Sequence, residues 1–229
     1  MAIDLHRYYP VFLDVAGRSV LIVGGGEVAS RKIETLLRCD AKIMVVALDT
    51  VSEISDLAEA GRIQLMAREY RFEDLEAQFV VIAATGDTEV NRRVGEDARQ
   101  RGILVNVVDA PQLCDFIVPA TFERGPIQVA VSTGGSSPAL ARVIRSSLES
   151  VLTPAIAELA EILGDLRPVA KEALATDEDR KRFFATLVDS DVLELLQRGQ
   201  RREAFDVLRQ LCLNAGVPSP QDNPRRDRE

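Results

Sequence analysis

Short aliphatic runs alternate with amphipathic stretches along the first half of the chain. Five such runs predict β-strands at 20–23, 42–48, 63–67, 79–85 and 103–109. Between them, apolar residues at helical spacing predict helices over 27–38, 50–60 and 88–101. Near-continuous apolar strands are typical of a parallel sheet that is covered on both faces. We therefore expect an α/β fold, with a doubly wound, Rossmann-like parallel sheet over residues 1–113.

The pattern changes after the fifth predicted strand. Two strand-like runs, 116–122 and 127–132, flank a turn that contains Gly-Pro. Pro119 lies inside the first run and predicts a sheet edge or a bulge, because proline cannot donate to a strand ladder. We expect a small α+β region over residues 114–150.

The last third of the chain has a helical pattern. Apolar residues recur at helical spacing over 151–217, and Pro154 and Pro168 punctuate the pattern. The charged residues among them form solvent-exposed faces. Residues 218–229 are rich in proline and charge, a composition that does not form a core. We expect a helical C-terminal domain over 151–217 and a disordered tail after it.

Composition limits the classes of protein and site. The net charge of −8 over 229 residues argues against a general nucleic-acid surface. The sequence shows neither a run long enough to span a membrane nor a secretory signal, so we expect a cytoplasmic protein. Cys39, Cys114 and Cys212 lie far apart, which indicates reduced thiols. The single histidine, His6, excludes a multi-histidine metal site within one chain.

A glycine-rich turn follows the first predicted strand. Gly24-x-Gly26-x-x-Ala29 matches the dinucleotide-binding pattern, with alanine in the third position, and it opens the first predicted helix. Small residues let the main chain approach a pyrophosphate, and the helix N-terminus supplies N–H groups. We predict that Gly24, Gly25 and Gly26 bind a nucleotide, the alternative being a plain tight turn.

Two more positions lie at the predicted carboxyl edge of the sheet. Asp49 follows the second strand, where an acid binds ribose hydroxyls, but it also suits the cap of the next helix. No arginine directly follows this strand to hold a 2′-phosphate, which favours NAD over NADP. Thr85 ends the fourth strand, where it either contacts the cofactor or forms part of a turn in which Asp87 caps the next helix.

A second Gly-Gly turn precedes a strong helix start. Ser137 is a good N-cap and Pro138 a good first helical residue. Together with Arg142, the hydroxyl and N–H groups of residues 132–135 suit an anionic ligand, such as a substrate with carboxylates. The alternative is a capped helix with a solvated face.

Asp109 ends the fifth predicted strand at the same edge of the sheet. A carboxylate there is an active-site candidate because open α/β sheets bind ligands at the carboxyl ends of their strands. Capping of a loop is the alternative role.

Five stretches resemble one known family. In chain order they are YPVFLDVAGRSVLIVGGGEVASRKIETLL, FVVIAATGD, NVVDAP, FIVPA and VAVSTGGSSPALAR. They are similar to the sirohaem synthase dehydrogenase/chelatase module, the family of precorrin-2 dehydrogenases and sirohydrochlorin ferrochelatases. The resemblance begins near Tyr9 and continues into the helical region.

The resemblance implies two reactions on a tetrapyrrole. The first is NAD+-dependent oxidation of precorrin-2 to sirohydrochlorin, and the second is insertion of Fe2+ to give sirohaem. Fe2+ would be a substrate that passes near Asp109, with no fixed metal site in the protein. The alternatives are a precorrin-2 dehydrogenase without chelatase activity and, from another class, a non-catalytic NAD-sensing regulatory domain.

The resemblance also implies roles for individual residues. Asp109 would be the catalytic residue, as a proton acceptor or in positioning Fe2+. Cofactor contacts would come from Gly24, Gly25, Gly26, Glu27, Val28, Leu48, Asp49 and Thr85. Substrate contacts would come from Ser132, Thr133, Gly134, Gly135 and Arg142, with Thr133 in place of a serine found in other members.

Two partner predictions follow from the same resemblance. Members form homodimers through the region that matches 114–150, so we expect a homodimer with its active site near the subunit interface. The larger fused synthases carry a methyltransferase domain for which this chain has no room. We therefore expect a separate uroporphyrinogen III methyltransferase upstream in the pathway, and partners that include neither nucleic acid nor membrane.

Overall fold

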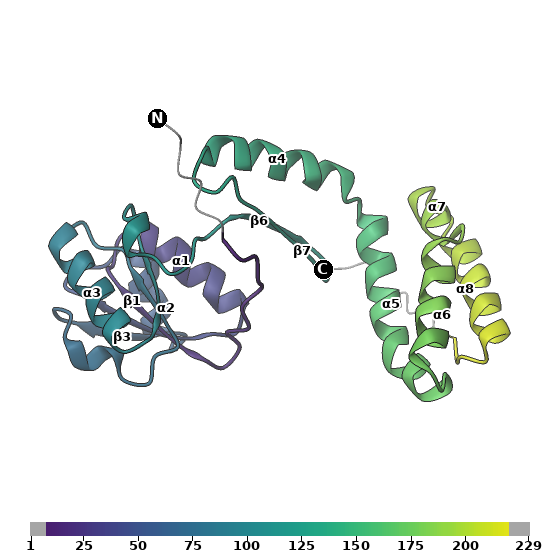
Figure 1. Cartoon of the computed structure of the whole chain (residues 1–229), viewed down its shortest axis with the longest axis horizontal. Helices are drawn as coiled ribbons and strands as arrows, with labels where there is room; N and C mark the ends of the chain where they lie inside the picture. The colour runs from purple at the N-terminus through teal and green to yellow at the C-terminus, as the bar shows by residue number, and fades with distance from the viewer. Residues whose placement is uncertain (1–7, 220–229) are drawn as a thin grey trace. The chain divides into compact units, whose positions relative to one another are not determined.

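The structure is a computed structural model that describes residues 8–219. It divides into two compact units, with the boundary between Val118 and Pro119 (Figure 1). His6 and residues 220–229 of the predicted tail lie outside the described residues.

The first unit contains the predicted parallel sheet. Its strands are β1 (Ser19–Val23), β2 (Lys42–Ala47), β3 (Gln64–Ala67), β4 (Val80–Ala83) and β5 (Leu104–Val107). They pair in the order β3-β2-β1-β4-β5, all parallel. The α/β fold with a Rossmann-like sheet is therefore confirmed. The central strand β1 is almost completely buried, as a sheet covered on both faces requires.

Helices cover both faces of the sheet. They are α1 (Glu27–Arg38), α2 (Ser52–Glu59), α3 (Thr88–Gln100) and the 3-10 helices η1 (Phe72–Leu75) and η2 (Pro111–Leu113). Alternate residues of β1 point to opposite faces. Val20 and Ile22 pack in the core that includes residues of α1 and α2, whereas Leu21 and Val23 pack in the core that includes residues of α3 and η1.

Several strands and helices of the sheet unit are shorter in the structure than the sequence pattern predicts. β2, β4 and β5 end one to two residues earlier than their aliphatic runs, because the chain turns at the carboxyl edge and the ladder stops there. Leu48, Thr85 and Asp109 therefore lie in loops. Val51 is the N-cap of α2, so the suggestion that Asp49 caps this helix is wrong.

The second unit starts with an antiparallel hairpin. Its strands are β6 (Ala120–Arg124) and β7 (Ile127–Val131). The prediction of a strand from residue 116 is wrong, because β6 starts immediately after Pro119. Proline lacks the N–H that a strand ladder needs, so a strand commonly begins beyond it.

Five helices follow the hairpin: α4 (Pro138–Val151), α5 (Pro154–Ala173), α6 (Asp177–Val188), α7 (Val192–Gln197) and α8 (Arg201–Ala215). Ser137 caps α4 and Pro138 is its first residue, as predicted. Helices α5 to α8 share one hydrophobic core. No helix of residues 8–219 is both long enough and apolar enough to cross a membrane.

Pro154 begins α5, but Pro168 lies inside it and does not interrupt it. Proline in a helix interior costs roughly 3 kcal/mol. Leu166 and Ala170, on either side of Pro168, are completely or almost completely buried in the core of this unit. Burial of both sides keeps the segment helical, which local sequence alone does not indicate.

Candidate functional site

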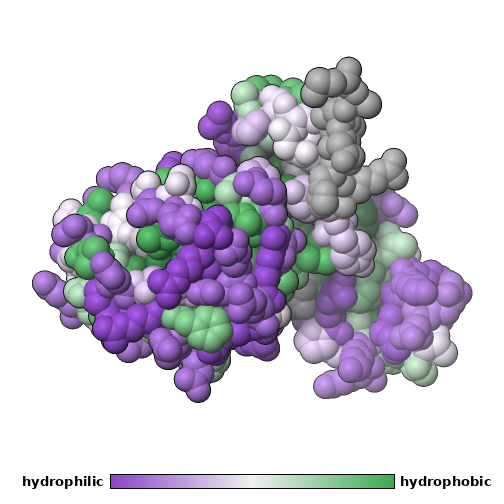
Figure 2. Space-filling model, turned by 60° about the vertical axis from the view of Figure 1, so that its left-hand side comes forward, coloured by the Kyte–Doolittle hydropathy of each residue, from purple (hydrophilic) through white to green (hydrophobic). Residues whose placement is uncertain are grey.

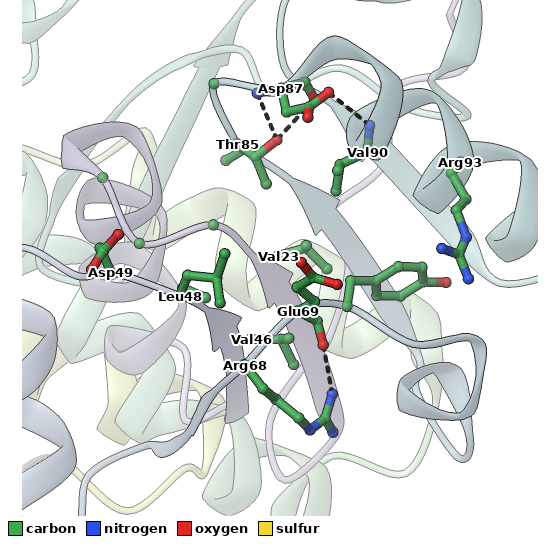
Figure 3. A pocket seen from close by; sticks show the side chains of 17 residues that line it. Val23, Val46, Leu48, Asp49, Arg68, Glu69, Thr85, Asp87, Val90 and Arg93 are labelled. Carbon is green, nitrogen blue, oxygen red and sulfur yellow. Dashed lines mark hydrogen bonds between the residues drawn. The ribbon is translucent and has the colours of Figure 1, made fainter.

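A cavity of about 520 Å³ lies at the carboxyl end of the parallel sheet (Figure 3). The glycine turn after β1, the loops after β2, β3 and β4, and the start of α3 line it. Open α/β sheets bind ligands at this edge. Of the predicted cofactor residues, the three glycines, Leu48, Asp49 and Thr85 line the cavity, whereas Glu27 and Val28 do not belong to its lining.

The three glycines of the turn differ in what surrounds them. A Cβ on Gly24 would lie 2.3 Å from the Ala84 carbonyl oxygen, and a Cβ on Gly25 would lie 2.1 Å from the Asp49 carbonyl oxygen. These two glycines let the neighbouring loops approach the turn. A Cβ on Gly26 would meet no atom of residues 8–219 within 4 Å. The space next to Gly26 is therefore open to a ligand.

The N-terminus of α1 begins at this open space. Gly26 is its N-cap, and no side chain within the described residues caps the helix. The N–H groups of the first turn of a helix lack partners within the helix, and the helix dipole adds a partial positive charge. This end of α1 can therefore bind an anion such as a pyrophosphate.

The loop after β2 contributes an apolar and an acidic side chain. Leu48 is 66% exposed although it is a large hydrophobic residue, and it lines the cavity. Asp49 is also exposed and lines the cavity. The Val51 N–H donates to the Gly25 carbonyl oxygen at 2.8 Å, which holds this loop against the glycine turn.

Thr85 has a structural role in the loop after β4. Its hydroxyl lies 2.8 Å from the Asn91 side-chain oxygen, and the Asn91 amide donates to the Thr85 carbonyl oxygen at 2.9 Å. Asp87 caps α3 by accepting from the N–H groups of Glu89 and Val90, as predicted. These bonds shape the turn that forms one wall of the cavity.

The loop after β3 supplies a wall that no motif in the sequence indicated. Arg68 lines the cavity and donates two hydrogen bonds to Asp74, at 2.6 and 2.9 Å. Burial raises the pKa of Asp74, but hydrogen bonds from Arg68 and from the Arg71 main chain outweigh this and lower the pKa below its usual value. The guanidinium of Arg68 is therefore neutralised within the protein.

A second arginine of the wall is also paired. Arg93, on α3, lies 3.7 Å from Asp97 and stacks near the ring of Tyr70. The Tyr70 hydroxyl donates to Asp97 at 3.1 Å. Burial, followed by the charge of Asp97, raises the pKa of Tyr70 above its usual range, so the hydroxyl stays protonated. Only the sheet order brings Tyr70 and Arg93 to the cavity.

Asp109 is at the tip of a tight turn after β5. Its φ is +59°, a left-handed conformation that costs a non-glycine residue energy and therefore needs support from its surroundings. The Ala110 N–H closes the turn on the Val107 carbonyl oxygen at 3.3 Å. The Asp109 side chain is exposed and does not belong to the lining of the cavity.

The thiol of Cys114 spans this turn. Its sulfur accepts from the Val107 N–H at 3.1 Å and lies within donating distance of the carbonyl oxygens of Val107, at 3.2 Å, and Ala110, at 3.4 Å. The Asp115 N–H donates to the Val105 carbonyl oxygen at 2.8 Å. The segment after η2 thus provides hydrogen-bond partners for main-chain groups on the outer edge of β5, and it supports the turn that contains Asp109.

The predicted substrate residues form a second loop, in the second unit. The Thr133 hydroxyl bonds both the N–H and the carbonyl oxygen of Ser137, each at 3.0 Å, and the Ser132 hydroxyl accepts from the Gly134 N–H at 3.0 Å. Gly134 and Gly135 have positive φ. Arg142 is exposed on α4. The Thr133 hydroxyl therefore stabilises the loop of residues 132–137.

Within residues 8–219, no group of three or more His, Cys, Asp or Glu side chains is arranged to hold a metal ion.

Three family models match successive parts of the chain. They are described as "Putative NAD(P)-binding", over residues 11–120, "Sirohaem biosynthesis protein central", over 124–150, and "Sirohaem synthase dimerisation region", over 155–211. The chain belongs to the sirohaem synthase family. The model named for dimerisation matches the helical region, whereas the resemblance in sequence implied dimerisation through residues 114–150.

Relatives of the sirohaem synthase family agree with this assignment. Siroheme synthase 1 of Pectobacterium atrosepticum is 42% identical over 208 residues, which are 91% of this chain and 43% of that protein. Siroheme synthase of Thioalkalivibrio sulfidiphilus is 41% identical over 201 residues, which are 88% of this chain and 41% of that protein. The chain thus spans less than half the length of these relatives.

A solved structure of a family member has the same fold. SirC, a precorrin-2 dehydrogenase, is 29% identical and superposes with a TM-score of 0.74. The match covers 89% of this chain and 98% of the SirC chain. The fold of the sheet, the hairpin and the helices is therefore shared with a protein that is named as a dehydrogenase.

Proposed function

We propose that the protein oxidises precorrin-2 to sirohydrochlorin with NAD+. The observation that carries this proposal is the cavity where the uncapped N-terminus of α1 meets the open space next to Gly26. These features fit a dinucleotide, because a pyrophosphate needs both N–H donors and close approach to the main chain. NAD+ supplies an acceptor for the hydride that leaves the tetrapyrrole, and a proton leaves with it.

The cofactor residues divide the binding between them. The turn Gly24–Gly26 and the main-chain N–H groups of Glu27 and Val28 bind the pyrophosphate. Asp49 accepts from ribose hydroxyls, Leu48 covers apolar surface of the cofactor, and Thr85 keeps the loop after β4 in shape. Arg68 and Arg93 are paired with Asp74 and Asp97, so the charge in this part of the cavity does not favour an additional 2′-phosphate.

Asp109 is the proposed proton acceptor. Its carboxylate is exposed at the carboxyl end of β5, next to β4, at the edge where the cofactor binds. The Cys114 contacts hold the main chain of the turn from which this side chain extends. A carboxylate at this position can accept the proton that leaves the ring when the hydride is transferred.

The loop of residues 132–135 and Arg142 are proposed to bind the tetrapyrrole. Main-chain N–H groups around residues with positive φ form concave anion sites, and Arg142 adds a positive charge on α4. Precorrin-2 and sirohydrochlorin carry peripheral carboxylates that such groups recognise. We propose that a uroporphyrinogen III methyltransferase supplies this substrate.

A second activity, insertion of Fe2+ into sirohydrochlorin to give sirohaem, is proposed because the curated relatives are named siroheme synthases. Fe2+ would enter as a substrate, and two ring N–H protons would leave. Asp109 would accept protons in this reaction as well. The name of the structural neighbour, precorrin-2 dehydrogenase, favours the alternative in which oxidation is the only reaction.

We propose a homodimer as the active assembly. The family model over 155–211 is named for dimerisation. In the same unit α4 exposes the apolar residues Leu140, Val143 and Val151, which are 51%, 62% and 65% exposed, and Figure 2 shows hydrophobic residues (green) at the surface. A contiguous exposed apolar face is typical of an interaction surface. Sedimentation at micromolar concentration should give a dimer, and a monomer would contradict this assembly.

Two anaerobic assays test the proposed function. The first contains precorrin-2 and NAD+, and we expect sirohydrochlorin and NADH in equal amounts. The second contains sirohydrochlorin and Fe2+ without NAD+, and enzyme-dependent sirohaem formation would establish the chelatase. Turnover in the first assay alone would leave a dehydrogenase, and turnover in neither would leave the NAD-sensing alternative.

A further inference from the structure

The cavity continues beyond the glycine turn to the end of β3. The sheet order places β3 next to β2, and residues of both following loops line the same cavity. The proposed pyrophosphate site lies at the end of β1 and the proposed ribose acid, Asp49, at the end of β2. The base attached to that ribose must then lie on the side of the cavity that the loop after β3 forms.

Apolar side chains are available for the faces of such a base. Leu48 extends from the loop after β2, and Val90 extends from the first turn of α3 (Figure 3). Leu48 is 66% exposed, although isoleucine, leucine and valine residues elsewhere in this unit are mostly buried. A flat aromatic base between these side chains would remove apolar surface from water.

The loop after β3 supplies a hydrogen-bond acceptor for the edge of the base. Arg68 donates to Asp74, Tyr70 donates to Asp97, and Arg93 forms a longer ion pair with Asp97 at 3.7 Å. The carboxylate of Glu69 also lines the cavity, and it forms no hydrogen bond or ion pair with a side chain or main-chain group of residues 8–219. Figure 3 shows this carboxylate among the lining side chains.

The chemistry of Glu69 selects one kind of purine. An ionised carboxylate only accepts hydrogen bonds. Adenine presents an exocyclic amino group, which donates, whereas hypoxanthine presents a carbonyl oxygen at the same position, which accepts. At this position two acceptors would face each other without a shared proton, and their repulsion weakens binding of hypoxanthine relative to adenine.

We propose that Leu48, Val90 and Glu69 form an adenine subsite, in which the Glu69 carboxylate accepts a hydrogen bond from the exocyclic amino group. This inference rests on the proposed function, because it assumes that the cavity binds a dinucleotide. The proposed function does not say how the base is recognised, and this inference assigns that role to Glu69.

Calorimetric titration of the full chain with NAD+ and with nicotinamide hypoxanthine dinucleotide tests the subsite. The two dinucleotides differ at the position that Glu69 contacts. We expect the wild-type protein to bind NAD+ about 10-fold or more tightly than the hypoxanthine dinucleotide. Glu69→Gln should bring the two affinities to within about 2-fold, because an amide can both donate and accept. Glu76→Gln, at another exposed glutamate just after η1, should keep the wild-type preference.

The outcomes separate the subsite from the proposed function. If the wild-type protein binds both dinucleotides equally well, or if Glu69→Gln keeps the wild-type preference, the adenine subsite is wrong while the dinucleotide site stands. If the wild-type protein binds neither dinucleotide, the proposed function fails and the subsite fails with it. Circular dichroism of each variant verifies that the fold is intact.

Discussion

Replacement of Gly26 by aspartate should affect stability and cofactor binding in opposite directions. A Cβ at this position meets no atom of the described part of the chain within 4 Å, and the φ of −88° and ψ of −176° are accessible to any residue. Gly26 is the N-cap of α1, where aspartate is among the preferred residues. The variant should therefore gain about 0.5 kcal/mol in free energy of unfolding, or about 2 °C in melting temperature.

The same carboxylate should oppose the pyrophosphate. Two like charges about 4 Å apart repel by about 4 kcal/mol at an effective dielectric constant of about 20. The position is exposed, so screening lowers this value to about 3 kcal/mol, which corresponds to about 100-fold weaker binding of NAD+. The new side chain also competes for the N–H groups of the first turn of α1, which adds to the loss.

Titration calorimetry with NAD+ and thermal unfolding without it measure the two effects separately. Gly26→Asn is the matched control, because asparagine also caps helices but carries no charge. It should have a similar melting temperature to Gly26→Asp and an NAD+ affinity between the wild type and that variant. NAD+ affinity unchanged in Gly26→Asp would refute the assignment of the pyrophosphate to this turn. A melting temperature lowered by several degrees would refute the reasoning about open space and capping.

Three more predictions follow from the site. Asp109→Asn should lower the rate of precorrin-2 oxidation by about 100-fold without changing NAD+ affinity or stability, because asparagine tolerates the left-handed turn but cannot accept the proton; wild-type rates would remove its catalytic role. Cys114→Ala should lower the turnover number by about 10-fold with unchanged NAD+ affinity, because the turn that holds Asp109 loses its sulfur contacts, and Cys114→Ser should restore part of the loss. Asp74→Asn should remove part of the acid sensitivity of unfolding: the lowered pKa of Asp74 stabilises the fold above the unfolded-state value near 4, and this stability is lost as the pH falls through the folded-state pKa. Identical pH profiles of the melting temperature in the wild type and Asp74→Asn would contradict this linkage.

Local sequence signals were sufficient to predict the strands of the sheet and the start of its first helix. Aliphatic runs indicated all five strands of the sheet, and small residues between a strand and a helix indicated the turn at Gly26. The helix start at Ser137 and Pro138 was equally visible, because capping depends on neighbouring residues. Each of these features is decided within a few residues of the chain.

Features that depend on distant parts of the chain were missed. Glu69 follows β3, and Arg93 lies on α3, which follows β4. Both residues line the same cavity because the sheet order β3-β2-β1-β4 brings the loops after these strands to one edge. Pro168 suggested a break, but the core around Leu166 keeps α5 continuous. The support of Asp109 by Cys114 was also hidden, because a sulfur that bonds main-chain groups leaves no motif.

A crystal structure of the protein with NAD+ and sirohydrochlorin would test the central claim most directly. We expect the pyrophosphate within hydrogen-bond distance of main-chain N–H groups at the start of α1, and the macrocycle next to both the nicotinamide and the carboxylate of Asp109. A macrocycle bound far from both groups, or a dinucleotide bound away from Gly26, would contradict the account.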